Sequence, residues 1–272
     1  MLRHNWAGET SAGDAGSSRK KLHVCTFVND RDQYQGMLDS MRAAGFDDAH
    51  CRFTAFENIS SNSHDPFKVI PETIARGPEP YVMFLHQDVL TDRGPKFDDL
   101  MTALKHLNDF DPAWAVAGTG GVDRWNNLIL CLDDPTGSYK APDLPKHVTS
   151  LDEHLLIFRR SHPVKLSHDL SGFHFYGTDA CLHAHRAGYT AYVINFHVTH
   201  LSCGNAKSQA FLNGREAFAA AWRKRLLVGL IYTTCTEVRI SRIPLIERLL
   251  SRDKIAWCFR KLRAPVVSVP TF

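Results

Sequence analysis

The sequence predicts an α/β protein with a mostly parallel central sheet flanked by helices, and three observations predict this fold class. The length of 272 residues fits one large α/β domain. Strand-like and helix-like segments alternate over 22–90, which is typical of a right-handed parallel βαβαβ unit. The segment YVMFLHQDVL at 81–90 begins with five apolar or aromatic residues in a row. Such a run is typical of a strand buried on both faces of a parallel sheet.

The elements of this unit follow from the periodicity of the apolar residues. Short apolar segments at 22–28 and 51–56 predict the first two strands. Apolar residues at helical spacing predict a helix over 33–44, and a glycine follows it as a stop signal. A second helix is expected over roughly 67–75, shortly before the third strand.

The second half of the chain is less regular. The segment 96–107 carries apolar residues on one helical face, and Trp114 begins a strand that enters a glycine-rich turn. The stretch 132–147 has the composition of an excursion loop. A helix with its body over 180–187 and a strand over 191–196 complete the expected domain.

Polar side chains arrive abruptly where each of the first three expected strands ends. They are Asn29 and Asp30, Glu57 and Asn58, and His86, Gln87 and Asp88. One polar strand end is ordinary, but parallel strands end on the same edge of a sheet, where α/β proteins bind ligands. Three such ends therefore predict a polar crevice of nucleotide size. The chain lacks GxGxxG after the first strand and GxxxxGK[ST], which disfavours a dinucleotide fold and a P-loop NTPase.

Two further sets of residues have types suited to metal ligation. His86 and Asp88 lie two residues apart, so on an extended chain they point to the same side. An imidazole and a carboxylate there can hold a divalent cation or grip a phosphorylated ligand. His197 and His200 form an HxxH at the end of the last expected strand and offer a nitrogen ligand. A lone histidine in this position is more often structural.

The segment GFHFYGTDACLHAHRAGY at 172–189 places a carboxylate at the start of a helix. Asp179 is expected to be exposed there, above a loop that contains Phe173, His174, Phe175 and Tyr176. One interpretation is an ordinary carboxylate that the helix dipole stabilises. The other is a general base, with the aromatic loop positioning an acceptor. Asp169 and Asp152 are the next candidates for such a base.

Over about residues 22–204 these motifs resemble family 2-like glycosyltransferases of the GT-A fold, in particular a bacterial subgroup with HQDV in place of the DxD motif. In this resemblance the first two strands grip the nucleotide, and the HQD segment occupies the place of the DxD. The chain departs from the family pattern at His86, which replaces the first Asp of the DxD, and at Thr178, which replaces the usual Glu. The donor-binding residues that the resemblance implies are Phe27, Val28, Asn29, Glu57, His86, Gln87 and Asp88.

The resemblance implies an inverting transfer from a nucleotide-diphospho-sugar to a hydroxyl of a glycan or a lipid-linked acceptor, in bacterial surface polysaccharide or glycan synthesis. Asp179 would remove the acceptor proton, and Asp88 and His200 would hold Mn²⁺ or Mg²⁺ on the donor diphosphate. A non-catalytic GT-A-like module that binds a nucleotide or glycan is the alternative. A His/Asp metallohydrolase ranks far behind, because the 15 histidines are scattered without an HExxH cluster.

Composition divides the chain into three parts. A leader at 1–20, rich in Gly and Ser, is expected to be disordered, and the GT-A domain is expected over 21–214. A basic helical extension is expected over 215–272. Within it, residues 215–263 hold 12 Lys and Arg against 4 Asp and Glu, which gives this segment a net charge of +8. The net charge of the whole chain is +3, so the other residues together carry −5.

The extension and the cysteines bear on partners and localisation. Apolar and basic residues over 243–262 are suited to peripheral contact with the anionic inner face of a cytoplasmic membrane, and a helix packed on the core is the equal alternative. The basic stretch has few aromatic residues and no recognised module, which disfavours a nucleic-acid partner. Seven cysteines without CxxC spacing, and the absence of a secretory signal, favour the cytoplasm.

Overall fold

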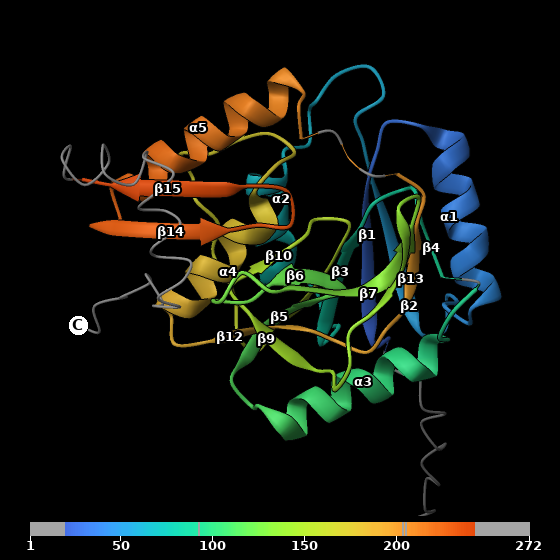
Figure 1. Cartoon of the computed structure of the whole chain (residues 1–272). Helices are drawn as coiled ribbons and strands as arrows, with labels where there is room; N and C mark the ends of the chain where they lie inside the picture. The colour runs from blue at the N-terminus through green and yellow to red at the C-terminus, as the bar shows by residue number, and fades with distance from the viewer. Residues whose placement is uncertain (1–19, 92, 203, 205, 243–272) are drawn as a thin grey trace, which may run out of the picture.

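The first half of the chain forms the parallel βαβαβ unit that the sequence predicts. The computed structural model describes residues 20–91, 93–202, 204 and 206–242 (Figure 1). The unit consists of β1 (Leu22–Val28), α1 (Arg31–Ala43), β2 (Cys51–Glu57), α2 (Pro66–Ala75) and β3 (Tyr81–Leu85). Strand β1 pairs in parallel with both β2 and β3. The predicted strands and helices of this half are therefore confirmed to within a few residues.

The central sheet has seven strands and is mostly parallel, as predicted. Its remaining strands are β5 (Trp114–Gly118), β9 (Lys146–Val148), β11 (Leu155–Arg159) and β12 (Thr190–Val193). The strand order is β2-β1-β3-β11-β5-β12-β9. Strand β11 runs antiparallel between β3 and β5, β12 runs parallel to β5, and β9 is antiparallel at the edge.

A second sheet covers one end of the first. Its members are β4 (Val89–Leu90), β6 (Gly120–Val122), β7 (Leu128–Asp134), β8 (Gly137–Lys140), β10 (Ser150–Leu151) and β13 (Val198–His200). The expectation of an excursion loop over 132–147 is wrong, because β7 turns back on β8 and the chain then enters β9. The Asp134 carboxylate, which accepts hydrogen bonds from the backbone of Thr136 and Gly137, stabilises this turn.

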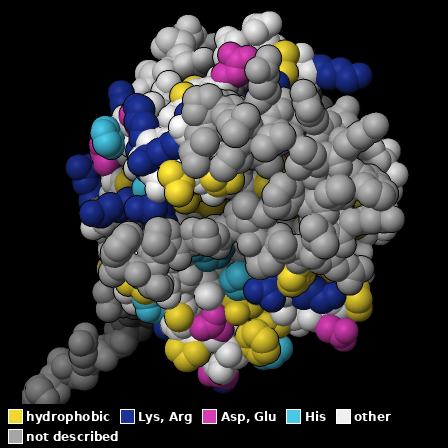
Figure 2. Space-filling model, turned by 60° about the vertical axis from the view of Figure 1, so that its left-hand side comes forward, with side chains coloured by type: hydrophobic (Ala, Val, Ile, Leu, Met, Phe, Trp, Pro, Cys, Tyr) yellow, Lys and Arg dark blue, Asp and Glu magenta, His cyan; other side chains and the backbone are white. Residues whose placement is uncertain are grey.

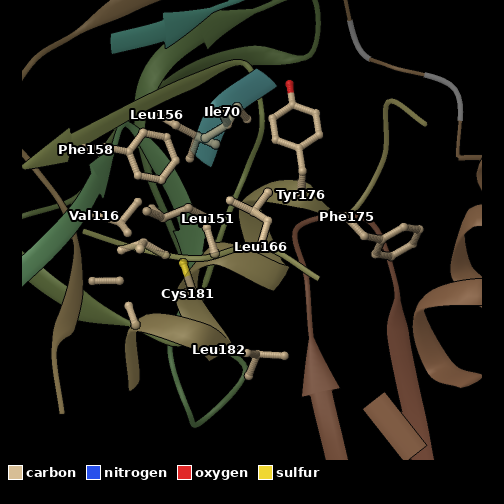
Figure 3. Close-up of a cluster of buried hydrophobic side chains, with 14 of the residues drawn as sticks. Ile70, Val116, Leu151, Leu156, Phe158, Leu166, Phe175, Tyr176, Cys181 and Leu182 are labelled. Carbon is tan, nitrogen blue, oxygen red and sulfur yellow. The ribbon is translucent and has the colours of Figure 1, made fainter. Parts of the chain in front are cut away.

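Helices cover both faces of the central sheet. They include α3 (Phe97–Phe110), α4 (Tyr176–Arg186) and α5 (Gln209–Arg223). Alternate residues of β1 enter two buried clusters, one with residues of α1 and α3 and the other with residues of α2, α4 and α5. In Figure 3, Cys181 of α4 points toward Leu151, in the cluster that also contains Val116 and Leu156 of the sheet. Tyr176 stands at the edge of this cluster with its hydroxyl pointing away from it.

The basic extension contains a β-hairpin where the sequence predicts helix. Strands β14 (Val228–Tyr232) and β15 (Glu237–Ser241) pair antiparallel and lie against α5 (Figure 1). The prediction is wrong for this part because Val228, Ile231, Val238 and Ile240 are β-branched residues, which favour strands. Phe218 and Trp222 of α5 are fully buried, so the extension packs into the core.

Figure 2 shows Lys and Arg side chains gathered on the face of the molecule that carries this hairpin. Within the described residues, no helix is long and apolar enough to cross a membrane. The expected leader, except for Lys20, and the expected amphipathic segment over 243–262 lie outside the described residues.

Candidate functional site

The polar ends of β1 and β3 meet at one edge of the central sheet. The backbone N–H groups of Asn29 and Asp30 donate to Oε1 of Gln87 at 3.0 and 3.1 Å. The Gln87 amide in turn donates to the side chains of Asn29 and Gln33. The Asp30 carboxylate caps α1, because its Oδ1 accepts the N–H groups of Asp32 and Gln33. The predicted convergence is therefore confirmed for the first and third strand ends.

A cavity of about 430 Å³, which we call the first cavity, opens at this edge. Its lining is rich in aromatic rings and amides: Phe27, Asn29, Gln33, Asn58, Asn62, His86, Gln87, Asp88, Phe173, His174 and Tyr176. The Asp65 carboxylate, at the start of α2, accepts the N–H of Gly172 at 2.7 Å and so fixes the loop that presents Phe173. Aromatic faces with amide groups around them suit a planar base and a ribose.

Val28 and Glu57, which the resemblance assigns to the nucleotide, lie outside this lining. Side chains alternate along a strand, so Phe27 and Asn29 face the cavity while Val28 is buried in the core. The Glu57 carboxylate is exposed and pairs with Arg31 at 3.1 Å. Asn58, one residue further on, takes the place that the sequence analysis gave to Glu57.

His86, Asp88 and His200 form a group with metal-ligand chemistry. One ligand atom from each lies within 4.8 Å of the other two. His200 Nε2 is 3.5 Å from Asp88 Oδ1, and His86 Nδ1 is 3.9 Å from the same oxygen. Two imidazoles and one carboxylate fit a divalent cation of intermediate hardness such as Mn²⁺. The sequence analysis considered His86 with Asp88 and, through the resemblance, Asp88 with His200, but it did not combine all three residues in one site.

Strand pairing, and not sequence proximity, brings His200 to Asp88. Strand β4 pairs antiparallel with β13, which places His200 opposite Val89. The N–H of Leu201 donates to the Asp88 carbonyl at 3.0 Å and extends this pairing. His86 and Asp88 lie in a tight turn, closed by the N–H of Val89 on the His86 carbonyl, and not on the extended chain that was predicted. The two side chains still approach each other across this turn, with His86 Nδ1 3.9 Å from Asp88 Oδ1.

The protonation states of this group suit cation binding. Burial lowers the pKa of His86, and the neighbouring His200 lowers it further, so the His86 imidazole is neutral at pH 7. Burial by itself would raise the pKa of Asp88, but the hydrogen bond and charge of His200 hold it well below its ordinary value. The Asp88 carboxylate in turn raises the pKa of His200, against the opposing effect of burial. A cation would replace the proton that His200 shares with Asp88.

A second cavity of about 330 Å³ adjoins the first. His86, Phe173 and His174 line both cavities, Asp88 lines the first, and His200 lines the second. The polar part of the second cavity is completed by residues from the β7–β8 turn, the β10–β11 turn, the segment after β13 and the β14–β15 turn: Asp134, Thr136, Asp152, Glu153, His154, Ser202 and Thr234. The metal-ligand group therefore stands at the junction of the two cavities.

Glu153 is the carboxylate of the second cavity whose pKa is raised. Its Oε1 accepts the N–H of Gly177, in the first turn of α4, at 3.1 Å. Burial and the adjacent negative charge of Asp152 raise the pKa of Glu153 to about 8. The pKa of Asp152 is lowered, because hydrogen bonds from His154 and Thr234 outweigh the effect of its burial. Two adjacent carboxylates with pKa values pushed apart are a common arrangement in acid–base catalysis.

His154 has a structural role in the second cavity. Its Nδ1 is 2.8 Å from Asp152 Oδ1, and its Nε2 is 2.7 Å from the Thr119 hydroxyl. Both ring nitrogens are thus engaged, and the ring stacks on His200 with centroids 5.2 Å apart. Histidines that are scattered in sequence do gather in space, but His154 offers no nitrogen to a metal.

Asp179 is buried, and the prediction that it is exposed is wrong. Its side chain is 0% exposed and lies outside the lining of both cavities. It accepts hydrogen bonds of 2.7 Å from the Ser167 N–H, the Ser167 hydroxyl and Trp222 Nε1. Burial raises its pKa. The helix starts at Tyr176, so Asp179 lies one turn into α4, where it connects α4 to α5.

The remaining candidates from the sequence either line a cavity or are packed or paired elsewhere in the structure. Phe175 is buried against Phe211 and Phe218, whereas Phe173, His174 and Tyr176 reach the cavities as expected for the aromatic loop. Asp169 pairs with Lys224 and Arg225, which directly follow α5, and lies outside the lining of both cavities. Glu153 was missed, although the ionisable run Asp152-Glu153-His154 inside an apolar segment was a signal that could have revealed it.

Comparisons with known proteins give one close relative and several distant structures. No protein-family model matches the chain. The protein named ATP synthase subunits region ORF 6, from Fuscovulum blasticum, is 35% identical over 224 residues, which cover 79% of this chain and 88% of that protein.

Among solved structures, TarS 1–349 of S. aureus is 12% identical with a TM-score of 0.47, over 75% of this chain and 64% of that one. GalNAc-T7 with UDP, GalNAc and Mn²⁺ is 9% identical with a TM-score of 0.44, over 76% of this chain and 50% of that one. This chain therefore spans less than two thirds of either structure. At such identities and scores neither structure carries an inference about activity.

Proposed function

We propose that this chain, which belongs to the same family as ATP synthase subunits region ORF 6 of Fuscovulum blasticum, transfers a sugar from a nucleotide-diphospho-sugar to an acceptor hydroxyl. One observation carries the proposal. The metal-ligand group of His86, Asp88 and His200 stands where a cavity with nucleotide-type lining meets a cavity that contains the carboxylate Glu153. A donor diphosphate at this junction would place its sugar toward Glu153.

The first cavity would bind the nucleotide. The Phe27 ring lies 5.6 Å from that of Phe84 and 5.8 Å from that of Phe173, which holds it rigidly at the cavity wall. A rigid aromatic face can support a nucleobase by stacking. Gln33 and Asn62 supply amide groups for the base edge and the ribose hydroxyls.

His86, Asp88 and His200 would hold a divalent cation beside the diphosphate. When bound, such a cation neutralises the charge that develops on the leaving diphosphate. The Tyr176 hydroxyl lies 3.3 Å from His86 Nε2 and also donates to the Glu153 carbonyl at 3.4 Å, which orients the His86 ring. Because two of the three ligands are imidazoles, the set should bind Mn²⁺ more tightly than Mg²⁺.

Glu153 would act as the general base, in place of Asp179. The acceptor hydroxyl oxygen forms a bond to the anomeric carbon while the bond from that carbon to the diphosphate oxygen breaks. The electron pair leaves with the nucleoside diphosphate, and the hydroxyl proton passes to the Glu153 carboxylate. A pKa near 8 suits this step, since the ionised form is a strong enough base and is still populated at neutral pH. One base without an enzyme nucleophile gives a single displacement, with inversion at the anomeric carbon.

A thermal-shift panel of nucleoside diphosphates and nucleotide-sugars, with and without Mn²⁺, tests the proposal. At about 100-fold above Kd, a nucleoside diphosphate should add roughly 2.7 kcal/mol of stability, and more in the presence of Mn²⁺. The variant Asp88→Ala should lose the Mn²⁺-dependent part, while Asp98→Ala, which removes an exposed carboxylate of α3, should keep it. Equal stabilisation of both variants by Mn²⁺ and nucleotide would exclude the proposed site.

Turnover separates this proposal from a non-catalytic binding module. The nucleotide-sugar that stabilises the protein most should be hydrolysed slowly to a free sugar and a nucleoside diphosphate, because water can replace the acceptor. Binding without any turnover would favour the module.

A further inference from the structure

Strand β7 presents a row of leucines that the proposed chemistry does not use. Leu128, Leu130 and Leu132 alternate with Ile129 and Cys131, so the leucines share one face of the strand. Ile129 and Cys131 point the other way into the core. Exposure falls along the row from 55% at Leu128 to 4% at Leu132. The leucines thus form a continuous apolar strip from the surface to the interior.

This strip is one wall of the second cavity. All three leucines line it, and Phe173 and Phe211 add aromatic surface to the same cavity. The acidic and imidazole groups Asp152, Glu153 and His200 belong to the same lining. Strand β7 pairs with β13, which places Val198 opposite Leu132. His200 follows two residues later at the end of β13. The buried end of the strip therefore meets the polar group, and its exposed end reaches solvent.

We infer that the acceptor is an amphiphile, a hydroxyl-bearing head group with a hydrocarbon or aromatic part attached directly to it. The inference rests on the proposed function and specifies its acceptor. The hydroxyl lies at Glu153, and the apolar part lies along Leu132, Leu130 and Leu128 toward the surface. Leucine side chains offer no hydrogen bonds, so sugar hydroxyls placed against them would lose their bonds to water. An apolar chain in the same place instead removes the leucines from water.

The exposure of Leu128 is a second reason to expect an apolar chain, and not a further sugar, along this wall. Leu128 is one of six large hydrophobic side chains that are exposed among the described residues. Leu128 lies in one row with Leu130 and Leu132, which line the same cavity. An apolar chain that covers Leu128 would therefore extend the contact that it makes with the other two leucines. The volume of about 330 Å³ accommodates a small head group together with the first part of a chain.

The experiment measures Kd by isothermal titration calorimetry for methyl, hexyl and octyl β-D-glucopyranoside, each below its micelle concentration, on the full chain. We expect Kd to fall with chain length, by up to about fourfold for each methylene that is buried. The variant Leu128→Ser should weaken octyl glucoside binding by about tenfold and leave methyl glucoside binding within twofold. Leu128 is exposed, so the substitution leaves the core intact.

Leu227→Ser is the matched control, because Leu227 is 63% exposed and lies outside the lining of the second cavity. Equal Kd values for the methyl and octyl compounds, or equal loss in the two leucine variants, would overturn the inference.

A separate arm measures the melting temperature of wild type and Leu227→Ser with UDP and Mn²⁺. A chain-length effect without any nucleotide response would count against the proposed function alone. A nucleotide response without a chain-length effect would count against the amphiphilic acceptor alone.

Discussion

The two cavities are assembled in different ways. The first takes most of its lining from strand ends and turns between Phe27 and Asp88, with a short aromatic loop added from 173–176. The second takes its lining from β7, from 152–154, from 200–206 and from the hairpin turn at 234–235. The first cavity therefore follows from one local topology, because parallel strands must end on one edge. The second depends on pairings between segments that are far apart in the sequence.

Two carboxylates near the start of α4 show the consequence of this difference. Asp179 belongs to the helix itself, and the resemblance to a known family selects it as the base. Glu153 comes from the β10–β11 turn and reaches the Gly177 N–H from outside the helix. The structure buries the first under α5 and leaves the second in a cavity. The helix start was recognised, but the carboxylate that we propose as the base at that start is supplied by another segment.

The largest effect is expected from removing the base of the second cavity. Glu153→Gln should lower the turnover of the nucleotide-sugar by about 10²–10⁴, because a general base contributes on that scale. Glutamine can still accept the Gly177 N–H through its amide oxygen, so the Mn²⁺-dependent binding of the nucleoside diphosphate should stay within twofold. Steady-state kinetics and the thermal-shift assay measure the two quantities. If Glu153→Gln turned over at the wild-type rate, Glu153 would not be the base, and the chemistry would not depend on this carboxylate of the second cavity.

The same side chain predicts a pH effect on stability. Since the pKa of Glu153 is raised from 4.5 to about 8 on folding, the folded protein keeps a proton that the unfolded chain loses. This contribution to the free energy of unfolding is complete below about pH 4.5 and is lost as the pH rises to about 8. Glu153→Gln should therefore gain stability over wild type as the pH rises, with a slope of at most about 1.4 kcal/mol per pH unit. Urea unfolding at pH 5, 6, 7 and 8 measures the difference, and a constant difference would contradict the raised pKa.

A change in stability, and not a direct change in chemistry, is expected at Asp179. In Asp179→Asn the amide nitrogen would face one of the donors of Ser167 or Trp222, which leaves buried donors without an acceptor. The free energy of unfolding should fall by about 1–3 kcal/mol. Turnover per folded molecule should stay within a few-fold. Asp169→Asn, which breaks a partly exposed ion pair with Lys224 and Arg225, is the control and should cost no more than about 1 kcal/mol.

The smallest effect is expected at Glu57, which the resemblance assigned to the nucleotide but which lies outside the lining of the first cavity. Glu57→Ala removes an exposed pair with Arg31, so the free energy of unfolding should change by less than about 1 kcal/mol. Nucleoside diphosphate binding should stay within twofold, because Glu57 does not line the first cavity. Asn29→Ala, which removes a lining residue bonded to Gln87, is the contrasting variant and should weaken binding measurably. If Glu57→Ala weakened nucleoside diphosphate binding more than Asn29→Ala does, Glu57 would have to contribute to the nucleotide site.

The parallel half of the sheet, and the edge at which its polar residues gather, can be predicted from the sequence alone. Apolar runs and helical spacing locate β1, α1, β2, α2 and β3 to within a few residues, because these patterns record which faces are buried. The sequence also selected Asp88 and His200 together, through the resemblance to a known site. The convergence of Asn29, His86 and Gln87 needed nothing beyond the direction of the strands.

The groups that join this edge are set by contacts between segments that lie far apart in the sequence. A buried face specifies that a strand has a partner but does not specify which strand it is, so the pairing of β4 with β13 has no local signal. The same holds for the antiparallel entry of β11 beside β3, which places Glu153 and His154 next to the end of β3. Burial is likewise a property of what packs on top, and α5 covers Asp179 from 43 residues away. The sequence therefore predicts the sheet edge at which we propose that the nucleotide binds, and the long-range pairings create the second cavity.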